Sequence, residues 1–211
     1  MRKFLCFLPC FLLCVLTPST SALAAEPVAT PTILVFGDSL SAGYGLAREQ
    51  AWPSLLGSRL KDSGSAYAVV NASVSGETTA GGLSRLPLAL QQHKPTIVII
   101  ELGANDGLRG LPIAAMRTNL TTMINASKAI GARVLLIGMR LPPNYGPDYT
   151  TQFAESYTLL AKQKQTALVP FLFEGFAGNP DAFQADHLHP TAASQTIMLN
   201  TVWQKLKPML R

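Results

Sequence analysis

Short apolar runs alternate with longer stretches of helical periodicity along most of this chain. The short runs are apolar at consecutive positions and rich in β-branched residues, as strands buried on both faces are, and they occupy residues 32–36, 67–71, 96–102, 133–138 and 167–169. The longer stretches repeat apolar residues at helical spacing, over residues 53–62, 79–91, 112–130, 151–164 and 191–207. Strand and helix in alternation predict an α/β fold, in which a central parallel sheet is covered by helices on both faces.

The first 24 residues follow a different pattern. Two basic residues, Arg2 and Lys3, precede an apolar run over residues 4–16, and the small residues of 22–24 fit a cleavage site, so residues 1–24 are predicted to be a secretory signal peptide. A membrane anchor is the alternative, but the run is shorter than the roughly 20 residues that cross a bilayer. Cleavage would leave residues 25–211, the size of one domain, in the periplasm or secreted.

The composition of residues 25–211 narrows the possible partners. All three cysteines lie in the predicted signal peptide, so we expect no disulfide and no thiolate metal site in the remaining domain. Loss of Arg2 and Lys3 would leave 15 basic residues against 12 acidic ones, a net charge of +3. That charge is too small to predict a nucleic-acid partner. We expect a protein without a stable membrane anchor, with a monomer favoured.

Four short blocks place polar side chains and glycines at positions that favour catalysis: residues 37–40, 76, 103–106 and 186–190. Three of them lie in the segments that follow predicted strands. In parallel sheets, ligands bind beyond the carboxyl ends of the strands, so these blocks are expected to meet at one edge. Together they supply a nucleophile, three oxyanion donors, and a base with its orienting group, which are the roles that acyl transfer to water requires.

The first three blocks provide the nucleophile and the oxyanion donors. Ser39 leaves the first strand through Gly37, where a tight turn into a helix would make the serine a nucleophile and its N–H an oxyanion donor. An ordinary helix N-cap serine is the alternative, and Asp38 is interpreted as a local cap without a role in proton transfer. Gly76 would offer a backbone N–H and Asn105 a side-chain amide to the same oxyanion. Plain turn residues are the alternative for both.

The fourth block provides the base. Asp186 and His189 are three residues apart, which puts both side chains on one face, so the carboxylate can bond one ring nitrogen while the other nitrogen faces Ser39. His187 is offset by one residue and is expected to point elsewhere. A metal site built from His187, His189 and Asp106 is the alternative. Catalytic zinc usually requires three well-placed ligands, and without a further patterned ligand we expect no metal.

These blocks resemble the invariant positions of the SGNH (GDSL) hydrolases, which are matched here by Ser39, Gly76, Asn105 and His189, with Asp186 completing a triad. Residues 71–82, 101–110 and 140–146 resemble the periplasmic multifunctional thioesterase/lysophospholipase and arylesterase branch. The resemblance implies a three-layer α/β/α, flavodoxin-like fold and hydrolysis of acyl esters and thioesters without cofactor or metal. This branch often has glycine and isoleucine where this chain has His187 and Leu188, which we interpret as a tolerated surface substitution.

The substrate is the least determined part of the prediction. Loops over residues 107–112 and 141–149 are expected to contact the acyl chain through Leu108, Leu111, Pro142 and Tyr145. The Gly-x-Ser-x-Gly elbow of α/β-hydrolases is not present around Ser39, and the first glycines have the wrong spacing for a dinucleotide site. A non-catalytic protein that binds acyl ligands on the same fold remains the alternative. Lysophospholipids, acyl thioesters and aryl esters all remain possible substrates, because they share the reacting carbonyl.

Overall fold

Five parallel strands form the centre of the protein. The computed structural model describes Met1 and residues 30–210, and its strands are β1 (Thr32–Gly37), β2 (Ala68–Asn71), β3 (Ile97–Glu101), β4 (Arg133–Ile137) and β5 (Ala167–Val169). Their order in the sheet is β2-β1-β3-β4-β5, and all neighbouring strands are parallel. The predicted α/β fold is therefore confirmed. The predicted signal peptide, apart from Met1, lies outside the described residues.

The central strands are apolar on both faces because both faces are covered. Residues 33–36 of β1 and 97–100 of β3 are completely buried. In contrast, β2 lies at the edge of the sheet, and its residues are only partly buried or exposed. The consecutive apolar pattern thus identified all five strands, but it predicted more complete burial for this edge strand than the structure has.

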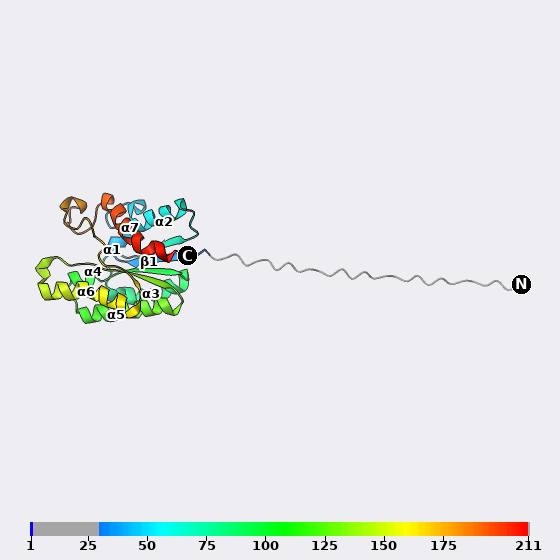
Figure 1. Cartoon of the computed structure of the whole chain (residues 1–211), viewed down its shortest axis with the longest axis horizontal. Helices are drawn as coiled ribbons and strands as arrows, with labels where there is room; N and C mark the ends of the chain where they lie inside the picture. The colour runs from blue at the N-terminus through cyan, green and yellow to red at the C-terminus, as the bar shows by residue number, and fades with distance from the viewer. Residues whose placement is uncertain (2–29, 211) are drawn as a thin grey trace.

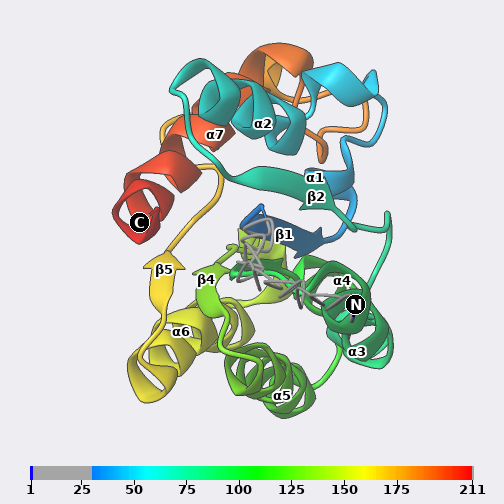
Figure 2. The ribbon, with the colours of Figure 1, turned by 90° about the vertical axis from the view of Figure 1, so that its right-hand side faces the viewer.

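Helices cover both faces of the sheet and complete three layers (Figures 1 and 2). One face carries α2 (Trp52–Asp62) and α7 (Ala192–Leu206), and the other carries α3 (Thr79–His93), α5 (Ile113–Ala129) and α6 (Pro147–Lys164). The last of these, α6, begins before its predicted start at residue 151, because Pro147 occupies its first turn. Proline lacks a backbone N–H, and N–H groups in the first turn of a helix have no partner within the helix, so no hydrogen bond is lost. No helix in the described part of the chain has both the length and the apolar character to cross a membrane.

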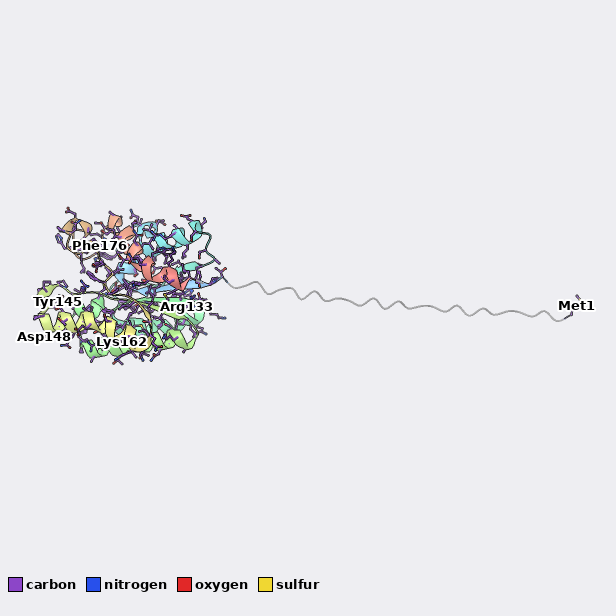
Figure 3. All side chains as sticks on the ribbon, viewed as in Figure 1. Met1, Arg133, Tyr145, Asp148, Lys162 and Phe176 are labelled. Carbon is purple, nitrogen blue, oxygen red and sulfur yellow. The ribbon has the colours of Figure 1, made fainter. Side chains whose placement is uncertain are left out.

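The loops at the carboxyl edge of the sheet carry the predicted blocks. Two short helices start there, α1 (Ser39–Ala42) directly after β1 and α4 (Ala104–Leu108) directly after β3. Figure 3 shows Tyr145 and Phe176 toward this end of the molecule, whereas Arg133, the first residue of β4, lies toward the other. The fold therefore brings the ends of separate strands to one surface, as parallel strands require.

Candidate active site

The first strand delivers Ser39 to the carboxyl edge of the sheet. Asp38 is the N-cap of α1, and its Oδ1 accepts a hydrogen bond from the N–H of Leu40 at 3.0 Å. Ser39 is consequently the first residue of the helix, so the alternative interpretation of this serine as an N-cap is wrong. At this position the Ser39 N–H has no acceptor within the helix and is available to a substrate oxygen.

A histidine and a carboxylate from the far end of the chain meet Ser39. His189 Nε2 lies 2.9 Å from Ser39 Oγ, and His189 Nδ1 lies 2.6 Å from Asp186 Oδ2. The other carboxylate oxygen, Asp186 Oδ1, accepts the N–H groups of Leu188 and His189, each at 3.0 Å. The hydrogen bond from the His189 N–H is the largest of the effects that lower the pKa of Asp186 to about 2, so the carboxylate is ionised at neutral pH.

A tyrosine that the sequence analysis missed packs against this histidine. The rings of Tyr44 and His189 lie 4.4 Å apart, centroid to centroid, with 35° between their planes. The side chain of Gln184 ties the two loops together, because its Nε2 donates to the carbonyls of Tyr44 at 2.8 Å and Pro190 at 3.1 Å. Gly45, with φ of +74°, is needed here, since a Cβ would lie 2.2 Å from Gln184 Oε1. The two glycines around Tyr44 were the only sequence signal of this contact.

The predicted oxyanion donors come from two further loops. Gly76 has a φ of +78°, in the left-handed region that favours glycine, and its carbonyl accepts a hydrogen bond from Arg109 Nη2 at 2.9 Å. Asn105 lies in α4, and its Nδ2 donates to Asp38 Oδ2 at 3.1 Å. Ser39, Gly76 and Asn105 line the same cavity. The contact between Asp38 and Asn105 was not expected from the sequence.

His187 and Asp106 do not combine with His189 in a metal site. The carboxylate of Asp106 accepts hydrogen bonds from the N–H of Thr79 at 2.7 Å and from the hydroxyl of Thr79 at 2.5 Å. It therefore binds the first residue of α3. Across the residues that the structure describes, no three His, Cys, Asp or Glu side chains are grouped to hold a metal ion. The hydrogen bonds of Asp106 thus give the metal alternative no support from this carboxylate. His187 lines the same cavity as His189, with a backbone φ of +55°.

An apolar cavity of about 1010 Å³ opens beside Ser39. Of the predicted substrate contacts, Leu108 and Pro142 line it, whereas Leu111 and Tyr145 do not. The hydroxyl of Tyr145 instead donates to the carbonyl of Leu108 at 2.9 Å, which places the tyrosine behind the lining. Much of the wall comes from a segment that the sequence analysis left without a role; the apolar side chains of this segment are Phe171, Phe173, Ala177, Pro180, Phe183 and Leu188.

Comparison with known proteins agrees with this geometry. Residues 35–197 match the GDSL-like lipase/acylhydrolase family. The chain is 51% identical over 188 residues to the esterase TesA of Pseudomonas aeruginosa, covering 89% of this chain and 94% of that protein. It is 40% identical to the thioesterase 1/protease 1/lysophospholipase L1 of Escherichia coli K12, covering 89% of each chain. A crystal structure of TesA superposes with a TM-score of 0.83 at 52% identity, covering 85% of this chain and 99% of that one.

These matches span nearly the whole folded domain, and the names of both relatives include the hydrolysis of esters or thioesters. The match to the family extends from the first strand into α7 and includes every block that forms the site. The chain therefore belongs to the GDSL-like lipase/acylhydrolase family and is a carboxylic ester hydrolase.

Proposed function

We propose that Ser39 is the nucleophile, His189 the base and Asp186 the group that orients the base. The observation that carries this proposal is the continuous chain of contacts from Ser39 Oγ to His189 at 2.9 Å and on to Asp186 at 2.6 Å. His189 accepts the proton of Ser39 as the oxygen attacks the acyl carbonyl, and it returns the proton to the leaving alcohol or thiol. Water, deprotonated by the same histidine, then releases the acid from the acyl enzyme.

The tetrahedral oxyanion would be held by three donors. These are the backbone N–H groups of Ser39 and Gly76 and the side-chain amide of Asn105, which all line the cavity. One N–H of the Asn105 amide is directed at Asp38, and the other remains for the oxyanion. Every step thus uses groups of this chain, and the mechanism requires neither a cofactor nor a metal.

The substrate we propose is a small acyl ester or thioester with a medium to long chain, of the lysophospholipid, acyl thioester or aryl ester type. The cavity supports this, because its wall is mostly apolar and its volume of about 1010 Å³ is at the upper end for ligand sites. The predicted signal peptide would place the enzyme in the periplasm or outside the cell, as a monomer without a stable anchor. N-terminal sequencing of the exported protein tests this, since the mature chain should begin near residue 25.

A phosphonate probe and a substrate series test the proposal together. A p-nitrophenyl phosphonate should label Ser39 alone, and Ser39→Ala should abolish both labelling and hydrolysis of p-nitrophenyl esters while circular dichroism stays unchanged. The matched control is Ser75→Ala, because Ser75 lines the same cavity but has no histidine partner in the described residues. Labelling of Ser75, or acyl-ligand binding without turnover, would contradict the assignment. Rates over an acyl-length series, with lysophospholipid beside acyl-CoA, would identify the substrate class.

A further inference from the structure

Two acidic side chains lie buried directly beneath the nucleophile. Asp38 and Glu101 are both fully buried: Glu101 ends β3, and Asp38 directly follows Gly37, the last residue of β1, which is in register with Glu101. Within the described residues, neither carboxyl forms an ion pair with a lysine or arginine. Two adjacent buried carboxylates without a cation cannot both be ionised at an acceptable free energy. The pair therefore must hold at least one proton.

The hydrogen bonds identify which acid carries that proton. Both oxygens of Asp38 accept N–H groups, from Leu40 at 3.0 Å and from Asn105 at 3.1 Å, and this favours its ionised form. Glu101 is different: its Oε2 accepts the hydroxyl of Ser41 at 2.7 Å and the N–H of Asp38 at 3.4 Å, but its buried Oε1 has no partner. The hydrogen bond from the Asp38 N–H to Glu101 Oε2 also holds the two acids next to each other. A proton on Glu101 leaves a neutral acid beside the carboxylate of Asp38 and so avoids two adjacent buried charges.

The pKa directions agree with this assignment. Burial, followed by the charge of Asp38, raises the pKa of Glu101 well above its usual range. Burial also raises the pKa of Asp38, to about 6, against the opposing effect of its hydrogen bonds to Leu40 and Asn105. At neutral pH, Glu101 is thus neutral and Asp38 is the ionised member of the pair.

We propose that Glu101, as a protonated acid, and Asp38, as its carboxylate neighbour, position the amide of Asn105 for the oxyanion. This rests on the role proposed above for Asn105. A carboxylate accepts but cannot donate, so it admits only the NH₂ side of the amide and prevents the flip that would present the carbonyl to the oxyanion. The same carboxylate caps α1 and fixes the Ser39 N–H. Asp38 and Glu101 are positioning residues, since neither has a part in bond making.

A double-mutant cycle tests whether Asp38 acts through Asn105. Asn105→Ala should lower kcat by about 10²- to 10³-fold, as loss of an oxyanion donor does, and Asp38→Asn should lower it by about tenfold or more with KM nearly unchanged. If Asp38 acts through Asn105, Asp38→Asn should lower kcat by no more than about twofold in the Asn105→Ala background. Multiplication of the two losses would overturn the proposal while leaving the Ser39 labelling result, and hence the proposed function, intact.

The protonation of Glu101 is tested by a variant with a neutral side chain of the same shape and by a measurement on the wild-type protein. Glu101→Gln should keep kcat within about threefold, because glutamine is neutral like the protonated acid, has nearly the same shape, and keeps an oxygen that can accept the Ser41 hydroxyl. Infrared spectroscopy of the wild-type enzyme at neutral pH should detect a protonated carboxyl band that Glu101→Gln removes. The control is Glu77→Gln, which should leave this band, because Glu77 lies outside the buried pair and contacts Arg85 instead. Absence of the band in the wild-type enzyme would refute a protonated Glu101.

Discussion

Replacement of His187 by glycine should make this enzyme more stable, although it removes a side chain close in sequence to His189, the proposed base. His187 has a φ of +55°, and a non-glycine residue in this left-handed region costs about 1–2 kcal/mol. Its backbone N–H donates to the Gln184 carbonyl at 2.9 Å, and glycine would keep that bond. The imidazole, in contrast, makes no hydrogen bond within the described part of the chain, so little would be lost with it.

The magnitude follows from two opposing contributions. Glycine removes the backbone strain but gains freedom in the unfolded chain, which costs about 0.5–1 kcal/mol. The free energy of unfolding should therefore rise by about 0.5–1 kcal/mol, and in a domain of this size each 1 kcal/mol raises Tm by about 2–4 °C. Calorimetry and urea unfolding of the mature protein measure both quantities. The same loop carries His189, so the substitution can change the rate. We expect kcat/KM to stay within about tenfold of the wild-type value, because the His189 side chain itself is unchanged.

Two control variants separate backbone strain from side-chain loss. Gln165→Gly relieves a similar φ of +49° at the end of α6, far from the cavity, and should raise Tm comparably without any effect on kinetics. His187→Ala removes the imidazole but keeps a Cβ in the left-handed region, so it should not be stabilising. A fall in Tm for His187→Gly, together with a rise for Gln165→Gly, would refute the reasoning and show that the imidazole contributes more than the strain costs.

Three further predictions follow from the site. His189→Ala should lose about 10³-fold or more in kcat/KM, whereas His187→Ala should stay within about tenfold, and equal losses would contradict the choice of base. Gly37→Ala should lower the free energy of unfolding by about 1–3 kcal/mol, because its Cβ would lie 2.6 Å from Glu101 Oε2. Gly178→Ala, which would contact nothing within 4 Å, is the control and should be nearly neutral. EDTA should not change the rate, and inhibition that zinc reverses would contradict a metal-free mechanism.

Local patterns predicted the layers of this fold well because they depend on short-range physics. A strand covered on both faces must be apolar at consecutive positions, and residues 33–36 and 97–100 are completely buried for that reason. The start of α6 was predicted too late, since Gly146 and Pro147 have the composition of a loop although a proline is well suited to a first helical turn. The pairing of Asp186 with His189 was equally local, as it depends on a spacing of three residues.

The contacts that sequence reasoning missed link segments far apart in the chain. Tyr44 reaches His189, and Asp38 reaches Asn105, only because loops after different strands meet at one edge of the sheet. The predicted acyl-chain contacts match the cavity lining only in part, for a related reason. Tyr145 has a suitable composition, but its hydroxyl bonds the carbonyl of Leu108 and so places it behind the wall. Composition identifies a loop that contacts a ligand, but it does not give the direction of each side chain.

The buried acid pair should make the free energy of unfolding fall as the pH rises. A carboxylate whose pKa is lowered by folding has the opposite effect. Asp38 has a pKa of about 6 in the folded protein against an ordinary 3.8, because burial disfavours its charge. The stability that it contributes is therefore fully present below pH 3.8 and is lost as the pH rises through about 6, with an upper bound of about 3 kcal/mol.

Asp186 acts in the other direction, since its pKa is lowered to about 2, but its contribution changes only below pH 3.8 and is reduced by the 40% exposure of its side chain. Between about pH 4 and 7 the free energy of unfolding should thus fall, because the raised pKa values of Asp38 and of Glu101 act in the same direction over this range. Urea titrations across this range compare the wild-type enzyme with Asp38→Asn, whose side chain does not titrate. The variant should show a shallower fall, because only Glu101 then contributes to it, and identical pH profiles for the two proteins would mean that Asp38 is not the acid that ionises beneath Ser39.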